Sequence, residues 1–201
     1  MSSILDISGQ EEVYVYETVM QSKDIHVFIN DYIEDLSFFR PLHKILMEAS
    51  ENDSVTFHMS CPGGWIYTAL TISNWIKSTN ASTMAILEGE NASASGIIIL
   101  ACDGVAVHEH SVLMCHSSQF GYSGLQDHVR GYVDFADKQL RNIAEDVYRG
   151  FLTEEEIDSI TIGSKEIWMD SDEIIKRLER REELREKESE YECGECEGDE
   201  E

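Results

Sequence analysis

Residues 89–96 read Gly-Glu-Asn-Ala-Ser-Ala-Ser-Gly and place two serines in a run of small residues. The run lies between two apolar segments, at 85–87 and 97–101. This order is typical of a strand that turns sharply into a helix, and such a junction exposes a serine hydroxyl. Because a serine hydroxyl is a poor nucleophile by itself, catalysis also needs a base, an acid that orients the base, and donors for an oxyanion.

Strands and helices alternate along most of the chain. β-rich runs occur at 13–19, 25–29, 55–59, 83–87, 105–107 and 111–115, and helical spacing of apolar residues occurs at 36–50, 65–76, 93–102 and 126–151. Repeated β-α units predict an α/β fold with a largely parallel sheet and right-handed crossovers. The steps of three and four over residues 126–151 predict one long helix.

Composition limits the class of protein and its partners. The 201 residues are 42% hydrophobic and carry a net charge of −25, which argues against nucleic acid or an anionic membrane as the main partner. With no apolar run long enough to span a bilayer and no basic leader at Met1, we expect a cytoplasmic protein. Five cysteines, three of them in apolar surroundings, argue against a disulfide framework as the basis of the fold.

The charge also divides the chain. The last fourteen residues contain eight acids and no base, too little apolar content for a folded segment. We therefore expect one folded domain over residues 1–180 and a charged, disordered acidic tail over 181–201.

A glycine-rich loop at 60–64, Ser-Cys-Pro-Gly-Gly, follows a predicted strand and opens a predicted helix. Two glycines allow a sharp turn and present backbone N–H groups without a side chain in the way, so the loop can stabilise an oxyanion. By itself such a loop is more often only a tight turn.

His116 ends an apolar strand and precedes a polar, glycine-containing loop, which is a suitable place for a general base. His108 and His110 flank a turn and are weaker candidates, and no third ligand at a suggestive spacing completes a metal site with them. The Cys193 and Cys196 pair supplies two ligands where zinc needs four, so we predict no metal site.

Four motifs, in order and at matching intervals, resemble the proteolytic subunit of the Clp protease, a serine peptidase of the crotonase-like fold. Residues 60–64 resemble Asn-Ser-Pro-Gly-Gly, and 89–94 resemble Gly-Gln-Ala-Ala-Ser-Met. Residues 111–116, Ser-Val-Leu-Met-Cys-His, resemble Ser-Arg-Val-Met-Ile-His, and 166–169, Glu-Ile-Trp-Met, resemble Asp-x-Phe/Trp-Leu/Met. The resemblance runs from about residue 25 to about residue 175.

The resemblance implies a catalytic apparatus. Ser93 is the nucleophile, His116 the base and Glu166 the acid, with the N–H groups of Gly64 and Ala94 as the oxyanion hole. Ser95 is the rival nucleophile, but the register of the motif places the family serine at Ser93. Residues 121–124 correspond to the handle strand, which mediates ring stacking in the family together with the long helix.

Three departures bear on this reading. The family acid is aspartate, one methylene shorter than Glu166, and Asp158 and Asp170 are the fallback acids. Asn91 stands where the family has a small apolar residue. The closing motif Glu-Tyr-Gly-Leu-Ile-Asp is replaced by a charged helical segment at 174–180. Its divergence and acidic tail suggest a viral or accessory homologue.

By resemblance we expect a serine endopeptidase that forms a stacked, ring-shaped homo-oligomer and cleaves unfolded polypeptides delivered by an AAA+ unfoldase. The chain has no phosphate-binding loop, so the partner would bind ATP and the chain itself needs no cofactor. Two alternatives are a catalytically inactive ring subunit and an acyl-CoA enzyme of the crotonase type.

Overall fold

The computed structural model of the chain describes residues 22–195, with side chains up to residue 189. The strand expected at 13–19 and the thiols of the C-x-x-C pair lie outside this part. Within it, no helix combines the length and apolar character that a bilayer crossing requires.

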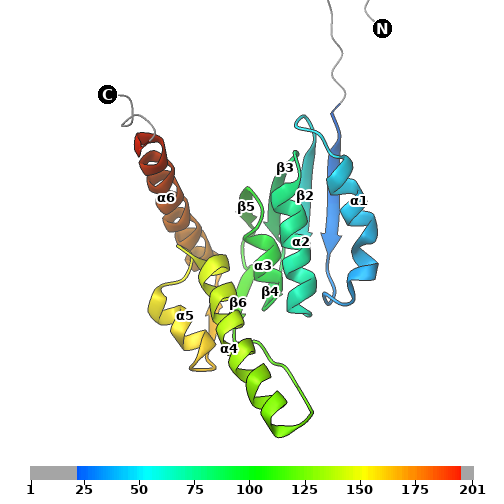
Figure 1. Cartoon of the computed structure of the whole chain (residues 1–201). Helices are drawn as coiled ribbons and strands as arrows, with labels where there is room; N and C mark the ends of the chain where they lie inside the picture. The colour runs from blue at the N-terminus through cyan, green and yellow to red at the C-terminus, as the bar shows by residue number, and fades with distance from the viewer. Residues whose placement is uncertain (1–21, 196–201) are drawn as a thin grey trace, which may run out of the picture.

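Four parallel strands form the main sheet, in the order β1-β2-β3-β5 (Figure 1). They are β1 (Asp24–Ile29), β2 (Ser54–Met59), β3 (Ser82–Leu87) and β5 (Gly104–Val107). The prediction of an α/β fold with a largely parallel sheet is confirmed. Parallel pairing places the carboxyl ends of β2 and β3, where the two predicted catalytic loops begin, at the same edge of the sheet.

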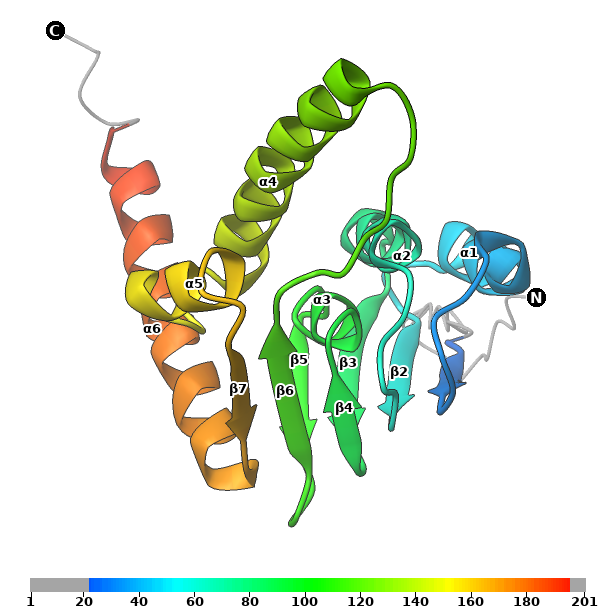
Figure 2. The same cartoon turned by 90° about the horizontal axis from the view of Figure 1, so that it is seen from below.

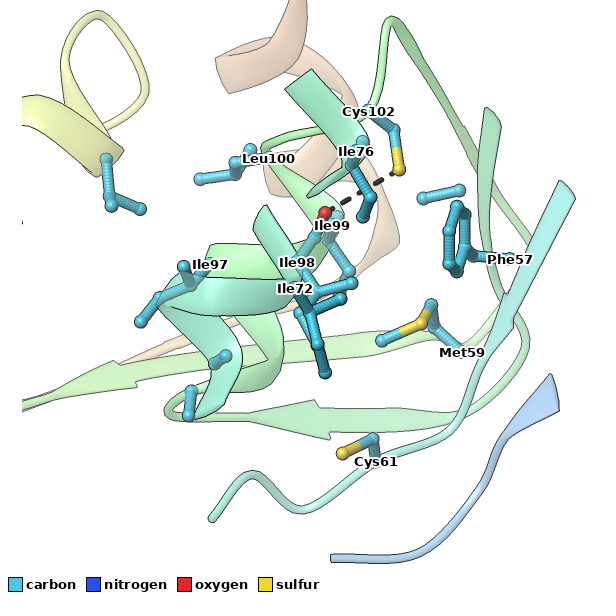
Figure 3. Packing of buried hydrophobic residues seen from close by; sticks show 14 of the residues in the cluster. Phe57, Met59, Cys61, Ile72, Ile76, Ile97, Ile98, Ile99, Leu100 and Cys102 are labelled. Carbon is cyan, nitrogen blue, oxygen red and sulfur yellow. Dashed lines mark hydrogen bonds between the residues drawn. The ribbon is translucent and has the colours of Figure 1, made fainter. Parts of the chain in front are cut away.

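Helices cover one face of this sheet (Figure 2). They are the 3-10 helix η1 (Leu36–Phe39), α1 (Arg40–Glu48), α2 (Ile66–Ser78) and α3 (Ser95–Ile99). Alternate residues of β2 point toward them, and Val55, Phe57 and Met59 have no exposed surface. Phe57 and Met59 pack beside Ile72 of α2 and Ile98 of α3, and this layer is the core that supports the loops (Figure 3).

A second sheet of three strands continues from the serine run. Strand β4 (Glu90–Ala92) pairs in parallel with β6 (Val112–His116), and β7 (Glu166–Met169) pairs antiparallel with β6. The register of the antiparallel pair sets His116 directly opposite Glu166. Directly opposed residues point to the same face of a sheet, so strand pairing brings together two residues that are far apart in the sequence.

The expected long helix is present as α4 (Gln126–Tyr148), which projects away from both sheets (Figure 1). Residues 121–124, expected to be a handle strand, are not a strand in the described chain. A β-strand requires a neighbouring strand for its backbone hydrogen bonds, and within residues 22–195 no strand pairs with the loop at 117–125.

The C-terminal boundary differs from the expected one. Helix α5 (Glu154–Thr161) precedes β7, and α6 (Ser171–Glu195) continues without a break across Arg180 into the region predicted to be disordered. Contacts with the body of the protein explain the difference: Arg181 Nη1 donates to the Leu100 carbonyl at 3.0 Å, and Arg149 Nη2 lies 2.6 Å from Glu188 Oε1. Composition alone does not reveal such contacts.

Candidate active site

Ser93 lies in a tight turn between β4 and α3. Its φ is 57°, in the left-handed region that residues with a side chain rarely adopt. The helix expected to begin at residue 93 therefore begins only at Ser95, because a left-handed residue cannot continue a right-handed helix. The Ser93 N–H donates to the Met114 carbonyl at 2.8 Å, which fixes the turn against β6. A strained serine at a strand-to-helix turn is the geometry of a nucleophile elbow.

The rival serine has a different environment. Ser95 has no exposed surface, and its Oγ donates to the Ala92 carbonyl at 2.8 Å. The Ala92 carbonyl thus occupies this hydroxyl, and backbone hydrogen bonds from the Ser93 and Gly96 N–H groups also hold the turn. Ser93 is partly exposed and lines the largest described pocket, whereas Ser95 does not.

The glycine loop lies directly against this turn. At Gly63, φ is 98°, and a Cβ atom there would be 2.6 Å from the Ala92 carbonyl oxygen and 2.8 Å from Ser93 Cβ. At Gly64, φ is 147°, and a Cβ would overlap the Ile33 carbonyl. Both positions therefore require glycine, because of backbone conformation and because of close approach.

Neither the Gly64 N–H nor the Ala94 N–H has an acceptor among residues 22–195. Gly64 forms a bridge with Ile33, but the bonds of that bridge use the Gly63 carbonyl and the Trp65 N–H instead. Ala94 precedes the first turn of α3, where backbone donors have no intrahelical acceptor. Free N–H groups that border one pocket with a nucleophile can receive an oxyanion.

One pocket collects these groups. It has a volume of about 610 Å³ and is bordered by Ser93, Gly64, Ala94 and His116. Aromatic and apolar side chains make up much of the remaining wall. They are Tyr32, Trp65, Ile66, Tyr67, Ile97, Met114, Phe120 and Tyr148. The described structure therefore brings four of the five predicted site residues to one cavity.

Fewer hydrogen bonds hold the side chains of the predicted base and acid than hold the serine turn and the glycine loop. His116 is partly buried at the end of β6, and within the described residues no hydrogen bond joins it to Ser93. Glu166 lies opposite His116 but is exposed, and its Oε2 accepts a hydrogen bond from Trp168 Nε1 at 3.1 Å. Glu166 does not border the pocket. Strand pairing thus places the acid beside the base without a hydrogen bond between them.

The fallback acids have other partners. Asp158 Oδ1 lies 2.7 Å from Arg141 Nη2, and Asp170 Oδ1 accepts from the Glu173 N–H at 2.9 Å, which caps α6. Neither residue borders the pocket. Of the three carboxylates, only Glu166 is paired in register with His116.

Cysteine chemistry and metal chemistry find little support at this site. Burial raises the pKa of the Cys61 thiol, and burial raises the pKa of Cys115 to about 12, so both stay protonated and weakly nucleophilic. In the described part of the chain, no group of three or more potential ligands could hold a metal ion. His108 and His110 are exposed and do not border the pocket.

Sequence reasoning missed several residues of the pocket wall. Trp65 and Tyr67 follow closely after the glycine loop, and this position in the sequence is the signal that could have placed them in the pocket wall. Tyr32 and Tyr148 come from the segment after β1 and from the end of α4, and no local pattern indicates that they reach the same cavity. Asp137 of α4 shares a smaller cavity of about 80 Å³ with His116.

A comparison with protein families now bears on these observations. The sequence pattern of the family described as Clp protease matches residues 8–177. The chain belongs to the Clp protease family. The match extends over most of the chain and includes the glycine loop, the serine turn, β6 and β7. A comparison with curated proteins gave no match.

Membership of the Clp protease family agrees with the described architecture of parallel sheet and long helices. It also confirms the resemblance drawn from the four motifs. Members of this family are typically serine peptidases.

Proposed function

We propose that this chain is a serine endopeptidase that hydrolyses unfolded polypeptides, with Ser93 as nucleophile, His116 as general base and Glu166 as the acid. The observation that carries the proposal is the convergence of Ser93, His116 and the free N–H groups of Gly64 and Ala94 on one pocket. Four groups with complementary roles in acyl transfer, drawn from two loops and the end of strand β6, meet at one cavity.

The chemistry follows from these positions. His116 accepts the proton of Ser93 Oγ as that oxygen attacks the carbonyl carbon of the peptide bond. The carbonyl oxygen becomes an oxyanion and accepts hydrogen bonds from the Gly64 and Ala94 N–H groups. His116 then gives its proton to the leaving nitrogen, and the C–N bond breaks. A water molecule, deprotonated by His116, hydrolyses the acyl-enzyme and regenerates Ser93.

The acid acts on the base rather than on the substrate. A carboxylate beside the imidazole holds the productive tautomer and stabilises the imidazolium. In this proposal Glu166 exchanges its hydrogen bond with Trp168 for one with His116 when substrate fills the pocket, a side-chain rotation that its exposure permits.

The proposal extends to assembly. Family membership supports a ring-shaped homo-oligomer with the sites inside, in the cytoplasm, working with an AAA+ unfoldase that hydrolyses ATP. The projecting helix α4 and the unpaired loop at 117–125 offer backbone and apolar surface for contacts between copies, including exposed Leu125 and Phe135.

One observation favours a second candidate function, a catalytically inactive ring subunit. No hydrogen bond within residues 22–195 links Ser93 to His116 or His116 to Glu166, so the triad is not assembled in this conformation. Such a subunit would keep the surfaces used in assembly and lack peptidase activity.

A fluorophosphonate probe separates the two functions, because it reacts with an activated serine. We expect the full-length oligomer to be labelled, Ser93→Ala to abolish labelling, and Ser95→Ala to retain it within about twofold. Ser95→Ala is the matched control because it removes a hydroxyl two residues away, at an expected cost of about 1 kcal/mol in unfolding free energy. An assembled oligomer that is not labelled would contradict the peptidase and support the inactive subunit.

A further inference from the structure

Asn91 is a buried polar residue whose role the proposed chemistry leaves unexplained. It lies in β4, two residues before Ser93, and has no exposed surface. Its Oδ1 accepts from the Cys61 N–H at 3.2 Å, and its Nδ2 donates to the Met59 carbonyl at 3.2 Å and the Gly89 carbonyl at 3.3 Å. One side chain thus connects the end of β2 to the start of the serine run.

These bonds join the two halves of the proposed oxyanion hole. Gly64 belongs to the loop at 60–64, which contains Cys61, whereas Ala94 belongs to the turn that follows Asn91. The Ala92 N–H also donates to the Cys61 carbonyl at 2.9 Å, so Cys61 is held by backbone and side chain together. The distance between the two N–H donors therefore depends on this connection.

Cys61 connects the Asn91 amide to the glycines through hydrogen bonds of its own. Its Sγ accepts from the Gly63 N–H at 3.4 Å and donates to the Asp31 carbonyl at 3.2 Å. Burial raises the pKa of this thiol, which keeps its proton available for Asp31. Gly63 in turn lies against Ser93 and Ala94. A continuous series of contacts runs from the Asn91 amide to the oxyanion loop.

The fold alone does not require an amide here. The motif that residues 89–94 resemble has a small apolar residue at position 91, so this turn can form without the side chain. Asn91, with its three hydrogen bonds, instead fixes the position of the loop at 60–64 relative to the serine turn.

We propose that Asn91 is a positioning residue, which holds the Gly63–Gly64 backbone against Ser93 and so sets the separation of the Gly64 and Ala94 N–H groups. The inference rests on the proposed function for its catalytic consequence. The three hydrogen bonds of Asn91 form a tether between the loop at 60–64 and the run at 89–94. This tether is a separate property that can be measured without activity.

The test uses full-length Asn91→Ala, with Thr83→Val as the matched control. Thr83 is also buried in the main sheet, and its Oγ1 donates to Asp103 Oδ2 at 2.8 Å, but it lies at the far end of β3 from the loops. Both variants remove buried hydrogen bonds, so a general loss of stability affects both. A third variant, Asn91→Asp, keeps the acceptor for Cys61 and loses the donor.

Two measurements are made on each variant. The first is hydrogen exchange of the backbone amides in segments 61–64 and 89–94. The second is kcat and KM for a small peptide ester, with the rate of fluorophosphonate labelling.

For Asn91→Ala we expect faster exchange confined to these segments, kcat lower by about 10-fold to 100-fold, and KM within about threefold, because misplaced donors act on the transition state. Asn91→Asp should lower kcat at least as much as Asn91→Ala, because its buried carboxylate would face the Met59 and Gly89 carbonyl oxygens without a hydrogen bond to them.

Unchanged exchange in both segments would overturn the tether whatever the kinetics show. A loss of kcat equal in Asn91→Ala and Thr83→Val would overturn the positioning role. If the assembled wild-type protein is not labelled at all, the proposed function fails, and faster exchange in Asn91→Ala would then leave a tether without a catalytic consequence.

Discussion

The two sides of the candidate active site are built differently. On the nucleophile side, Ser93, Gly63 and Gly64 are held by backbone hydrogen bonds, buried side chains and close contacts that admit only glycine. On the base side, His116 and Glu166 are held by one antiparallel strand pair, and the acid is exposed. In the proposed mechanism the nucleophile side is thus preorganised, whereas the base side requires a side-chain rearrangement before it acts.

This contrast has a physical basis. Backbone N–H groups cannot rotate independently, so once two loops pack together the oxyanion donors are in place. An exposed glutamate has several rotatable bonds and competing partners, here Trp168 Nε1 and water. In the proposed mechanism, the glutamate that stands for the aspartate of the family motif therefore lies on the side of the site with fewer hydrogen bonds and contacts.

The largest predicted effect comes from breaking the nucleophile side at Gly63. Gly63→Ala places a Cβ where Ser93 Cβ and the Ala92 carbonyl already lie, so the loop must move away from the serine turn. We expect fluorophosphonate labelling to fall by about 100-fold, since a shift of about 1 Å has this effect on a positioned reaction. Gly131→Ala in α4, where a Cβ meets nothing within 4 Å, is the control and should label like the wild type. Normal labelling of Gly63→Ala would show that the loops are not closely coupled.

An intermediate effect is expected from the ion pair that supports the base side. Arg177 of α6 donates to both carboxylate oxygens of Glu156 in α5, at 2.7 Å each, and thereby ties together the two helices that flank β7. These hydrogen bonds lower the pKa of Glu156 to about 2, from an ordinary value of 4.5. Because the folded-state pKa is depressed, the stabilisation is complete above about pH 4.5 and is lost as the pH falls toward 2.

Glu156→Gln should therefore lower the unfolding free energy by about 2 kcal/mol at pH 7, and the difference from the wild type should shrink as the pH approaches 2. Urea denaturation at pH 7 and pH 3 measures both quantities. Glu145→Gln, which removes an exposed ion pair with Arg141, is the control and should change the free energy by less than about 0.5 kcal/mol. A pH-independent difference would mean that the ionised pair is not the source of the stabilisation.

The smallest predicted effect concerns the acid. Glu166→Gln should lower the labelling rate by about tenfold, far less than the ~10⁴-fold cost of the equivalent change at a buried triad aspartate, because the carboxylate is exposed. Trp168→Phe removes the competing donor and should raise the rate by about threefold if the carboxylate then turns to His116. Equal rates in all three proteins would remove Glu166 from the catalytic apparatus.

Much of the candidate site could be predicted from the sequence. The loop with Gly64 follows the apolar strand 55–59, the serine run follows the apolar strand 83–87, and His116 ends a third apolar strand, and the carboxyl ends of neighbouring parallel strands meet at one edge. Three features could not be predicted: the start of α3 at Ser95, the absence of a strand at 121–124 and the continuation of α6 beyond Arg180. Each depends on backbone conformation or on contacts with distant residues. The same holds for Tyr32 and Tyr148 in the pocket wall, which arrive from remote parts of the chain.

The sequence by itself determined the family, most of the helices and of the main-sheet strands, and the candidate residues, because periodicity and short motifs are local properties. Only the tertiary structure showed that the two serines have different surroundings, since Ser95 is buried with its hydroxyl bonded to the Ala92 carbonyl, whereas Ser93 borders the pocket. It also decided that Glu166 lies in register with His116 but bonds to Trp168, and that Asn91 joins the two loops. Pairing and close approach between segments far apart in the chain set these relations, and no local pattern encodes them.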